Sequence, residues 1–246
     1  MGETSFTRHD QFPETRWTLI RRATDANPEQ MRLALEEFCR TYWFPLYCYA
    51  RRRGHSVHDA QDTIQSFFVH LLDQTEKFRH LDANHGKLRS WLLTSLRNFL
   101  SNERKRSLAA KRGGSVPILA IDIDLAEERL GTWNPVADAT TAEHDFDRLW
   151  AETVLRLARQ KLRTTFETAG KGREYEILKP FLTKGTPEGL IPEAAAKLEK
   201  TEGAVRMAIL RLRDDYRVAI QCEIADTLDV DDDVEEEVRY LISCLG

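Results

Sequence analysis

Four arginines in the last third of the chain have the type and spacing to bind phosphate. If residues 202–220 form a helix, Arg206, Arg213 and Arg217 project from one flank and Arg211 lies on the other side. A guanidinium group suits phosphate oxygens because its planar fork donates several hydrogen bonds at once. The pattern predicts a helix that packs through one face and binds phosphate through the other. From these residues alone, a helical hairpin with solvated arginines is an equal alternative.

The residues around these arginines predict how the helix is held. Residues 191–220 indicate two helices joined by a tight turn, with Pro192 in the first turn of the first helix. Ala194 and Ala195 give that helix a small apolar face, and Thr201 can cap the second helix. The second helix has an apolar stripe made of Val205, Ala208, Ile209, Leu212 and Tyr216. Small residues on one helix let the other cross it closely, so the stretch predicts a helix-turn-helix.

Two earlier segments predict helices with polar faces. Residues 56–72 begin with Ser56 and Asp59 at the spacing of a capping box. Their polar face consists of Asp59, Asp62, Gln65, Ser66 and Val69. Residues 87–108 give a longer helical pattern whose polar side and cationic end include Arg97, Asn98, Ser101, Asn102, Lys105 and Arg106. Amides and hydroxyls can pair with exposed base edges while Arg and Lys hold the backbone, although a solvated helix also tolerates these residues.

Charge is segregated along the sequence. The net charge of the 246 residues is −4, yet residues 28–112 contain 15 Lys and Arg against 9 Asp and Glu. Residues 113–145 contain 7 Asp and Glu and a single Arg. The mean charge therefore conceals a basic domain followed by an acidic segment.

Composition limits the class of protein. With 41% hydrophobic and 31% charged residues, the chain can bury one large core or two small ones and is expected to be soluble. No apolar run approaches the length of a membrane span or a signal peptide, so we expect a cytoplasmic protein with no membrane partner. Cys39, Cys48, Cys222 and Cys244 lack C-x-x-C spacing, which favours buried free thiols over a metal or redox site.

These patterns predict an all-α fold of two small helical domains joined by an acidic linker, the second ending in the helix-turn-helix. Pro45 is expected to separate two helices of the first domain. The predicted divisions are an N-terminal arm (1–26), a first domain (27–112), the linker (113–139), a second domain (140–228) and an acidic tail (229–246). We expect the tail to repel DNA or to fold over the basic hairpin.

Two motifs resemble those of bacterial sigma factors of the extracytoplasmic-function (ECF) group. Residues 193–206, E-A-A-A-K-L-E-K-T-E-G-A-V-R, and R-L-R at 211–213 resemble the promoter-reading end of these proteins. Residues 59–65, D-A-Q-D-T-I-Q, resemble the segment that binds the clamp helices of the RNA polymerase β′ subunit. The similar segments cover residues 33–112 and 145–225.

The resemblance implies a role for each domain. The first domain would bind polymerase core through Asp59, Asp62, Gln65, Ser66 and Val69. It would open the minus-ten element through Arg97, Asn98, Ser101, Asn102, Lys105 and Arg106, with a flipped base captured by the loop at 73–86. The second domain would read the minus-thirty-five element through Lys200, Thr201, Arg206, Met207, Arg211, Arg213 and Arg217. Met207 departs from the family, because its thioether can touch a thymine methyl but lacks the hydrogen-bonding capacity of the usual residue.

The implied partners are promoter DNA and RNA polymerase core, contacted at the β′ clamp helices and the β flap. An anti-sigma factor is a further partner that the resemblance allows, and no catalytic residue, cofactor or metal is implied. A helix-turn-helix transcription regulator that does not engage polymerase core is the alternative, since it would use the same hairpin. An enzyme acting on nucleic acid is disfavoured, because the sequence lacks a metal-ligand cluster, a phosphate-cradling glycine loop and a nucleophile–base motif.

Overall fold

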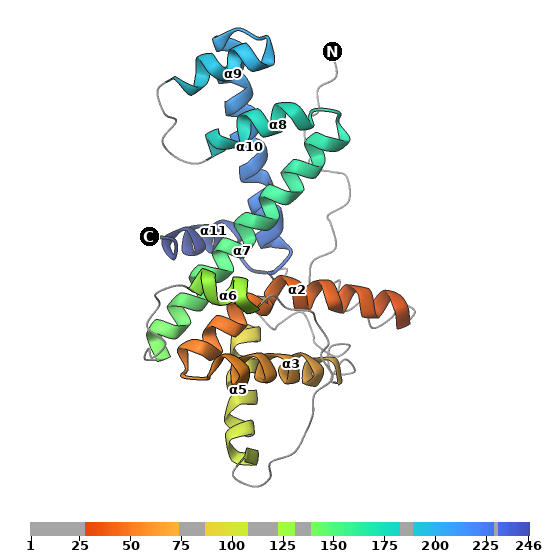
Figure 1. The fold of residues 1–246 in the computed structure, drawn as a ribbon, viewed down its shortest axis with the longest axis vertical. Coiled ribbons are helices and arrows are strands. Elements are labelled where there is room, and N and C mark those ends of the chain that lie inside the picture. Colours follow the sequence, from red (N-terminus) through yellow and green to blue (C-terminus); the bar gives the residue numbers. More distant parts are fainter. Residues whose placement is uncertain (1–27, 74–86, 108–122, 131–138, 183–188, 229–230) are drawn as a thin grey trace. The chain divides into compact units, whose positions relative to one another are not determined.

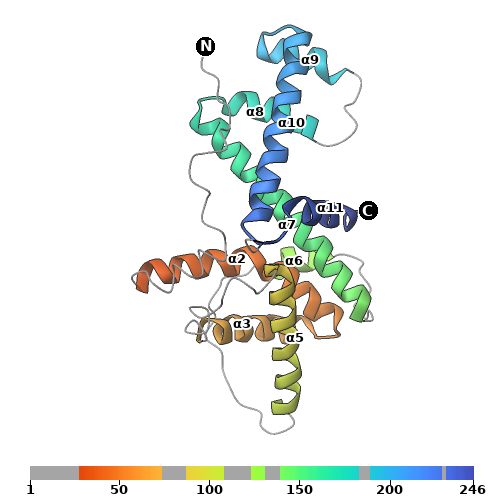
Figure 2. The same cartoon turned by 180° about the vertical axis from the view of Figure 1, so that it is seen from behind.

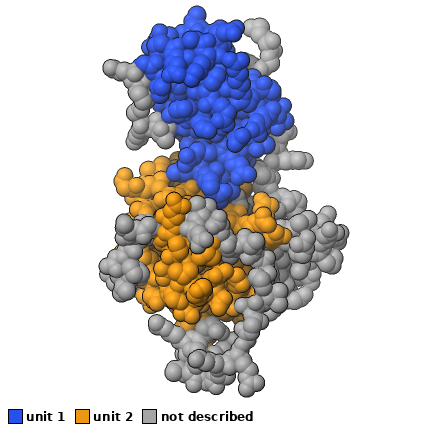
Figure 3. All heavy atoms as spheres, viewed as in Figure 1, with its two compact units in different colours: residues 1–13, 154–224 blue, residues 14–153, 225–246 orange. Residues whose placement is uncertain are grey.

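A computed structural model of the chain describes residues 28–73, 87–107, 123–130, 139–182, 189–228 and 231–246. The described segments form helices and contain no strand (Figures 1 and 2), so the prediction of an all-α fold is confirmed for them. They divide into two compact units, coloured in Figure 3. Unit 1 contains residues 154–224, and unit 2 contains the described residues of 28–153 and 225–246.

Unit 2 is built from α2 (Pro28–Arg52), α3 (Val57–Asp73), α5 (Leu88–Ser107), α6 (Ile123–Leu130), the first half of α7 (Ala139–Thr168) and α11 (Val234–Ser243). Helix α5 crosses α3 in both views (Figures 1 and 2). Apolar stripes at helical spacing meet in its core, and Tyr42 of α2 stacks on Trp150 of α7 with ring centroids 4.4 Å apart. Its largest fully buried side chains are Tyr42, Leu46, Tyr47, Ile64, Phe67, Phe68, Leu88, Leu92, Leu96, Phe146 and Trp150.

The predicted break at Pro45 is wrong, because α2 continues through it. An internal proline costs about 3 kcal/mol through a lost hydrogen bond and a clash with the preceding turn. Burying one large apolar side chain contributes about 1.5–3 kcal/mol, and Tyr42, Leu46 and Tyr47 are all buried beside the proline. Packing therefore outweighs the proline, and α2 bends along its length instead of ending (Figure 1).

Part of the predicted linker is a packed helix. In α6, Ala126 and Leu130 are buried four residues apart. The Glu127 carboxylate accepts hydrogen bonds from Tyr47 Oη at 2.6 Å and from Arg51 Nε and Nη2, each at 2.9 Å. The hydrogen bonds from Arg51 are the largest influence on the Glu127 carboxyl, and they lower its pKa below the ordinary 4.5. Burial acts in the opposite direction but is outweighed. Residues 123–130 are thus part of unit 2.

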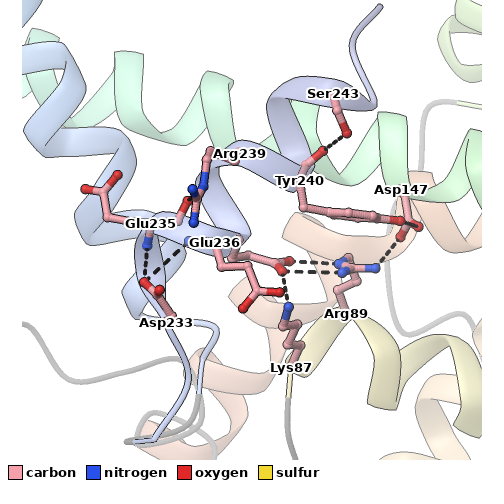
Figure 4. A network of polar contacts seen from close by, with 10 residues as sticks. Lys87, Arg89, Asp147, Asp233, Glu235, Glu236, Arg239, Tyr240 and Ser243 are labelled. Atoms are coloured by element: carbon pink, nitrogen blue, oxygen red, sulfur yellow. Dashed lines mark hydrogen bonds and ion pairs between the residues drawn. The ribbon is translucent and has the colours of Figure 1, made fainter.

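The C-terminal segment also packs as a helix. Asp233 caps α11 by accepting hydrogen bonds from the backbone N–H groups of Glu235 and Glu236 at 2.9 and 3.4 Å (Figure 4). Glu237, only 1% exposed, forms an ion pair with Lys87 at 2.7 Å. It also accepts hydrogen bonds from Arg89 Nε and Nη2 at 2.9 and 3.4 Å. Residues 231–246 are therefore an element of unit 2.

The Glu237 contact belongs to a small polar network within unit 2. Arg89 also donates a hydrogen bond to Asp147 at 2.8 Å, and Tyr240 donates to the other oxygen of Asp147 (Figure 4). The Arg89 guanidinium lies over the Tyr240 ring, 4.4 Å from its centroid. The network joins α5, α7 and α11 through residues far apart in the sequence.

The compact units do not coincide with the predicted divisions. Residues 140–153 and 225–228, predicted for the second domain, and residues 231–246 of the predicted tail group with unit 2. The roles assigned to the domains stay a prediction. The predicted arm at 1–26 lies outside the described residues.

Unit 1 contains the second half of α7, α8 (Gly172–Leu178), the 3₁₀ helix η1 (Lys179–Leu182), α9 (Leu190–Leu198) and most of α10 (Glu202–Ala225). Tyr216 of α10 donates a hydrogen bond to the Leu155 carbonyl of α7 at 3.2 Å. The core consists of Leu162, Tyr175, Leu178, Phe181, Ala194, Ala195, Val205, Ile209 and Leu212. Within the described parts of the chain, no helix combines the length and apolar character needed to cross a membrane.

Candidate nucleic-acid interface

Three residues join α9 to α10 and fix the start of α10. Glu199 adopts a left-handed conformation with φ 53°. The N–H groups of Glu199 and Lys200 donate to the carbonyls of Ala196 and Ala195 at 3.3 and 3.0 Å. This hydrogen-bond pair is the Schellman arrangement that ends a helix sharply. Thr201 Oγ1 accepts from the Ala204 N–H at 3.2 Å, so the predicted cap is confirmed.

Small side chains allow α9 and α10 to pack together. Ala194 and Ala195 are buried in the same cluster as Val205, Ile209 and Leu212 of α10. An alanine Cβ occupies little space, so the helices can approach closely. The predicted apolar faces of both helices are therefore turned into the core of unit 1, which leaves the opposite face of α10 exposed.

That exposed face carries three of the predicted phosphate-binding arginines. Arg206, Arg211 and Arg217 are exposed. Arg206 contacts Glu202 and Arg217 contacts Asp214, each at 3.4 Å between exposed groups. Exposed ion pairs of this kind contribute about 0.2–1 kcal/mol, so these arginines can exchange their partners for phosphate at little cost.

Arg213 lies differently from the other arginines. Its Nε donates a hydrogen bond to the Phe181 carbonyl of η1 at 2.9 Å, and its side chain is half-buried. The residue follows the buried Leu212 and lies at the edge of the apolar stripe, where it is within reach of η1. Arg213 thus has a structural contact that holds η1 against α10, and its assignment as a base or phosphate contact stays a prediction.

The turn residues predicted to contact DNA already have roles in the fold. Lys200 Nζ forms an ion pair with Glu174 at 2.6 Å. The Thr201 hydroxyl acts as the cap of α10. Both residues are exposed at the start of α10, so their backbone atoms and the Lys200 ammonium are open to solvent there.

Two large apolar side chains lie among the exposed arginines. Met207 is 51% exposed and Leu210 is 52% exposed. Met207 was predicted to face outward, whereas Leu210 was missed by sequence reasoning. Its spacing three residues after Met207 was the available signal, because residues i and i+3 share a helix face.

The polar face of α3 is only partly displayed. Asp59 and Asp62 are exposed, and Ser66 and Val69 are half-buried. Gln65 is only 6% exposed, which does not favour its predicted place on a polymerase-binding surface. It follows the buried Ile64 and lies at the edge of the apolar stripe, where packing covers its amide.

The start of α3 has the predicted capping residues in a modified form. The Asp59 N–H donates to Ser56 Oγ at 3.1 Å, and the Ser56 hydroxyl donates to the Asp59 carboxylate at 2.7 Å. A regular capping box would send the carboxylate to the Ser56 backbone N–H instead. Asp59 is thus exposed and also stabilises the start of α3. Asp62 is exposed as well but takes no part in this cap.

The polar face of α5 is displayed as predicted. Arg97, Asn98, Ser101 and Asn102 are all exposed. Arg97 forms an ion pair with Glu143 at 2.8 Å, in a position open to solvent. The side chains of Lys105 and Arg106 lie outside the described residues, as do residues 74–86 of the loop at 73–86 that was predicted to capture a base.

The cysteines and acids give no sign of a metal centre in the described part of the chain. No group of three or more His, Cys, Asp and Glu residues there is arranged to hold a metal ion. Cys39, Cys48 and Cys244 are buried and free, while Cys222 is half-buried, so the prediction of buried free thiols holds for three of the four. Burial raises the pKa of Cys39 to about 12, which keeps it a thiol at neutral pH.

Comparison with known protein families gives a match to the middle part of unit 2. Residues 42–108, which include α3 and α5, match a protein-family model described as Sigma-70 region 2. A search of curated proteins and a search of solved structures found no match.

Proposed function

We propose, from the premise that the chain is a sigma factor of the sigma-70 family, that it belongs to the ECF group and directs promoter-specific transcription initiation by RNA polymerase core. The observation that carries the proposal is the exposed polar face of α5. Arg97, Asn98, Ser101 and Asn102 lie within the segment that matches region 2. Their amides, hydroxyl and guanidinium have the chemistry to hold a separated promoter strand.

The assignment of the minus-ten element to α5 depends on the position of these groups. Asn98 and Asn102 are four residues apart and share one side of the helix, as do Arg97 and Ser101. Asparagine offers both a donor and an acceptor to an unpaired base, and arginine can hold the adjacent phosphate. This row of side chains favours a single DNA strand that runs along α5.

The minus-thirty-five element is assigned to α10. The α9–turn–α10 segment has the elements of a helix-turn-helix, with its second helix exposing Arg206, Arg211 and Arg217. In that motif the second helix enters the major groove, and its first turns contact the bases. Charge complementarity between these arginines and DNA phosphate supports the assignment.

Polymerase core is assigned to the exposed part of the α3 face. Asp62 is the best single contact, because Asp59 also caps α3 and Gln65 is buried. Ser66 and Val69 complete the surface. Binding of core implies a cytoplasmic location, with the β′ clamp helices as the expected partner of α3 and the β flap as that of unit 1.

The test is transcription reconstituted from the purified full-length chain, polymerase core and a library of promoter sequences. We expect initiation from a subset of sequences that share two elements. Asp62→Ala should weaken co-purification with core about 5-fold or more, the size of roughly 1 kcal/mol or more at an interface. Glu236→Ala removes one exposed acid elsewhere and is the matched control.

The outcomes separate the two candidate functions. A chain that binds particular DNA sequences yet fails to bind core would be a helix-turn-helix regulator, and the sigma-factor proposal would be wrong. Equal core binding by wild type and the Asp62→Ala variant would refute the α3 assignment alone.

A further inference from the structure

We propose that the outward face of α10 recognises thymine methyl groups, with Met207 and Leu210 as the residues that determine specificity. The inference rests on the proposed function, because it takes α10 to enter the major groove of promoter DNA. It adds the chemical class of base that this chain prefers.

Exposure sets Met207 and Leu210 apart from the other apolar residues of unit 1. They are the large hydrophobic side chains of this unit that are exposed among its described residues, at 51% and 52%. They lie three residues apart on the side of α10 opposite Val205, Ile209 and Leu212. Together they leave neighbouring apolar surface in water that a partner could cover.

The charges beside this pair indicate nucleic acid as the partner. Arg206 precedes Met207 and Arg211 follows Leu210, so each apolar side chain has an exposed arginine next to it. Arg217 lies two turns after Leu210 on the same side of α10. An apolar groove on a protein would offer no negative charge to these arginines. The major groove of DNA has phosphates along both edges, which can pair with them.

The start of α10 is small enough for close approach. Gly203 and Ala204 are exposed in the first turn, and a Cβ atom placed on Gly203 would have no atom within 4 Å. Glycine in a helix costs about 1 kcal/mol relative to alanine, so its use here suits a surface that another molecule approaches. The first turn could therefore lie near the base edges, with Met207 and Leu210 following into the groove.

Thymine is the base that Met207 and Leu210 can recognise. Its 5-methyl group is the apolar feature of the major groove, and apolar side chains contact it. Between Gly203 and Leu210 the face offers no hydroxyl, amide or carboxylate for a base edge. Asp214, the next exposed acid along α10, contacts Arg217 at 3.4 Å. Arg206 can pair with a guanine or a phosphate, so methyl contact is the discriminating chemistry that Met207 and Leu210 add to this face.

The test uses thymine and deoxyuridine, which differ only by this methyl group. The full-length chain bound to polymerase core would first select its preferred upstream element from a random duplex library. Each thymine of that element would then be replaced by deoxyuridine, and duplex affinity measured by competition. We expect about a 4-fold loss for each contacted methyl, the value of about one buried methyl group.

Variants assign the contact to particular side chains. Met207→Ala and Leu210→Ala, both at exposed positions, should bind the thymine duplex less tightly and lose its advantage over deoxyuridine. Arg211→Ala should weaken both duplexes by the same factor and reduce the salt dependence by about one phosphate contact. The ratio of the two affinities therefore separates methyl contact from phosphate contact.

Each result has one meaning. Equal affinity for both duplexes, an element without thymine, or a ratio unchanged by both alanine variants would overturn the inference and leave the sigma-factor proposal intact. Variants that lose core binding with the ratio unchanged would assign the apolar pair to a protein contact. A holoenzyme that selects no upstream element would refute the minus-thirty-five assignment together with this inference.

Discussion

Replacing Glu237 with glutamine tests how strongly α11 is held within unit 2. Glutamine keeps the size of the side chain but removes the charge that Lys87 and Arg89 share at 2.7 and 2.9 Å. The change leaves the Tyr240–Asp147 hydrogen bond in place. The loss of stability therefore measures the ion pairs without adding a cavity.

The size of the effect follows from what each cation keeps. Breaking a buried ion pair by removing one partner costs about 3–5 kcal/mol, because a charge is left unpaired. Arg89 keeps Asp147 at 2.8 Å, and Lys87 is partly open to water, so the cost falls at or slightly below the lower end of this range. We expect a loss of about 2–3 kcal/mol, or about 4–12 °C in Tm for a chain of this size.

Thermal and urea unfolding followed by circular dichroism would measure this loss. Glu236→Gln is the matched control, because it removes the same charge from the same turn of α11 at an exposed position. It should change stability by less than about 0.5 kcal/mol. Equal losses in the two variants would show that the helix dipole matters and the buried pairs do not.

The pH dependence gives an independent check. Burial raises the pKa of Glu237, but hydrogen bonds and charge from Arg89 and Lys87 outweigh burial and hold it below 4.5. A lowered pKa contributes stability above the unfolded value and loses it as pH falls through the folded value. The advantage of wild type over Glu237→Gln should therefore be full at neutral pH and shrink as pH falls below 4.5. A constant difference across that range would refute the reasoning.

Three further predictions concern other contacts. Glu199→Gly should raise the free energy of unfolding by about 0.5–1 kcal/mol, because glycine adopts the left-handed conformation without strain. Ala196→Gly, in the neighbouring turn of α9, should lower it by about 1 kcal/mol. Urea midpoints of the two variants and wild type would measure both changes. Arg213→Ala should lower the Tm without changing the salt slope of DNA binding, whereas Arg206→Ala should reduce that slope by about one. Glu127→Gln should destabilise unit 2 by about 1–2 kcal/mol, seen as a lower urea midpoint, because Arg51 and Tyr47 lose a charged acceptor.

Periodic apolar spacing was enough to predict most helices, because burying a stripe stabilises a helix regardless of what it packs against. The α9–α10 segment was predicted down to the Thr201 cap, since capping is local and depends on side chains a few residues apart. Pro45 was misjudged because its cost is local while the compensating burial of Tyr42 and Leu46 comes from the whole unit.

The contacts of α6 and α11 could not be predicted for a different reason. Glu127 pairs with Arg51 across 76 residues of sequence, and Glu237 pairs with Arg89 across 148. The sequence around such an acidic residue does not indicate whether its partner is water or a distant arginine. Only the fold identifies that partner.

The candidate sites show where a motif and an exposed surface diverge. The D-A-Q-D-T-I-Q segment carries Asp62 and Gln65 three residues apart, which predicts a shared face. The true apolar arc of α3 extends to Gln65, so one member of the motif is exposed and the other is buried. The same applies to Arg206 and Arg213 on α10, which are seven residues apart but differ in burial because η1 reaches only the second.

The place of α11 also decides between two roles for the acidic C-terminal segment. If its charge repels DNA, Glu236→Gln and Glu237→Gln remove equal charge and should raise DNA affinity equally, with an effect that fades at high salt. If α11 instead positions the start of α5, only Glu237→Gln should alter DNA binding, and it should weaken it. The structure supports the second role, because Glu237 of α11 forms an ion pair with Arg89 in the first turn of α5 at 2.9 Å. A charge acting at a distance would not require that contact, whereas a helix that holds α5 in place would.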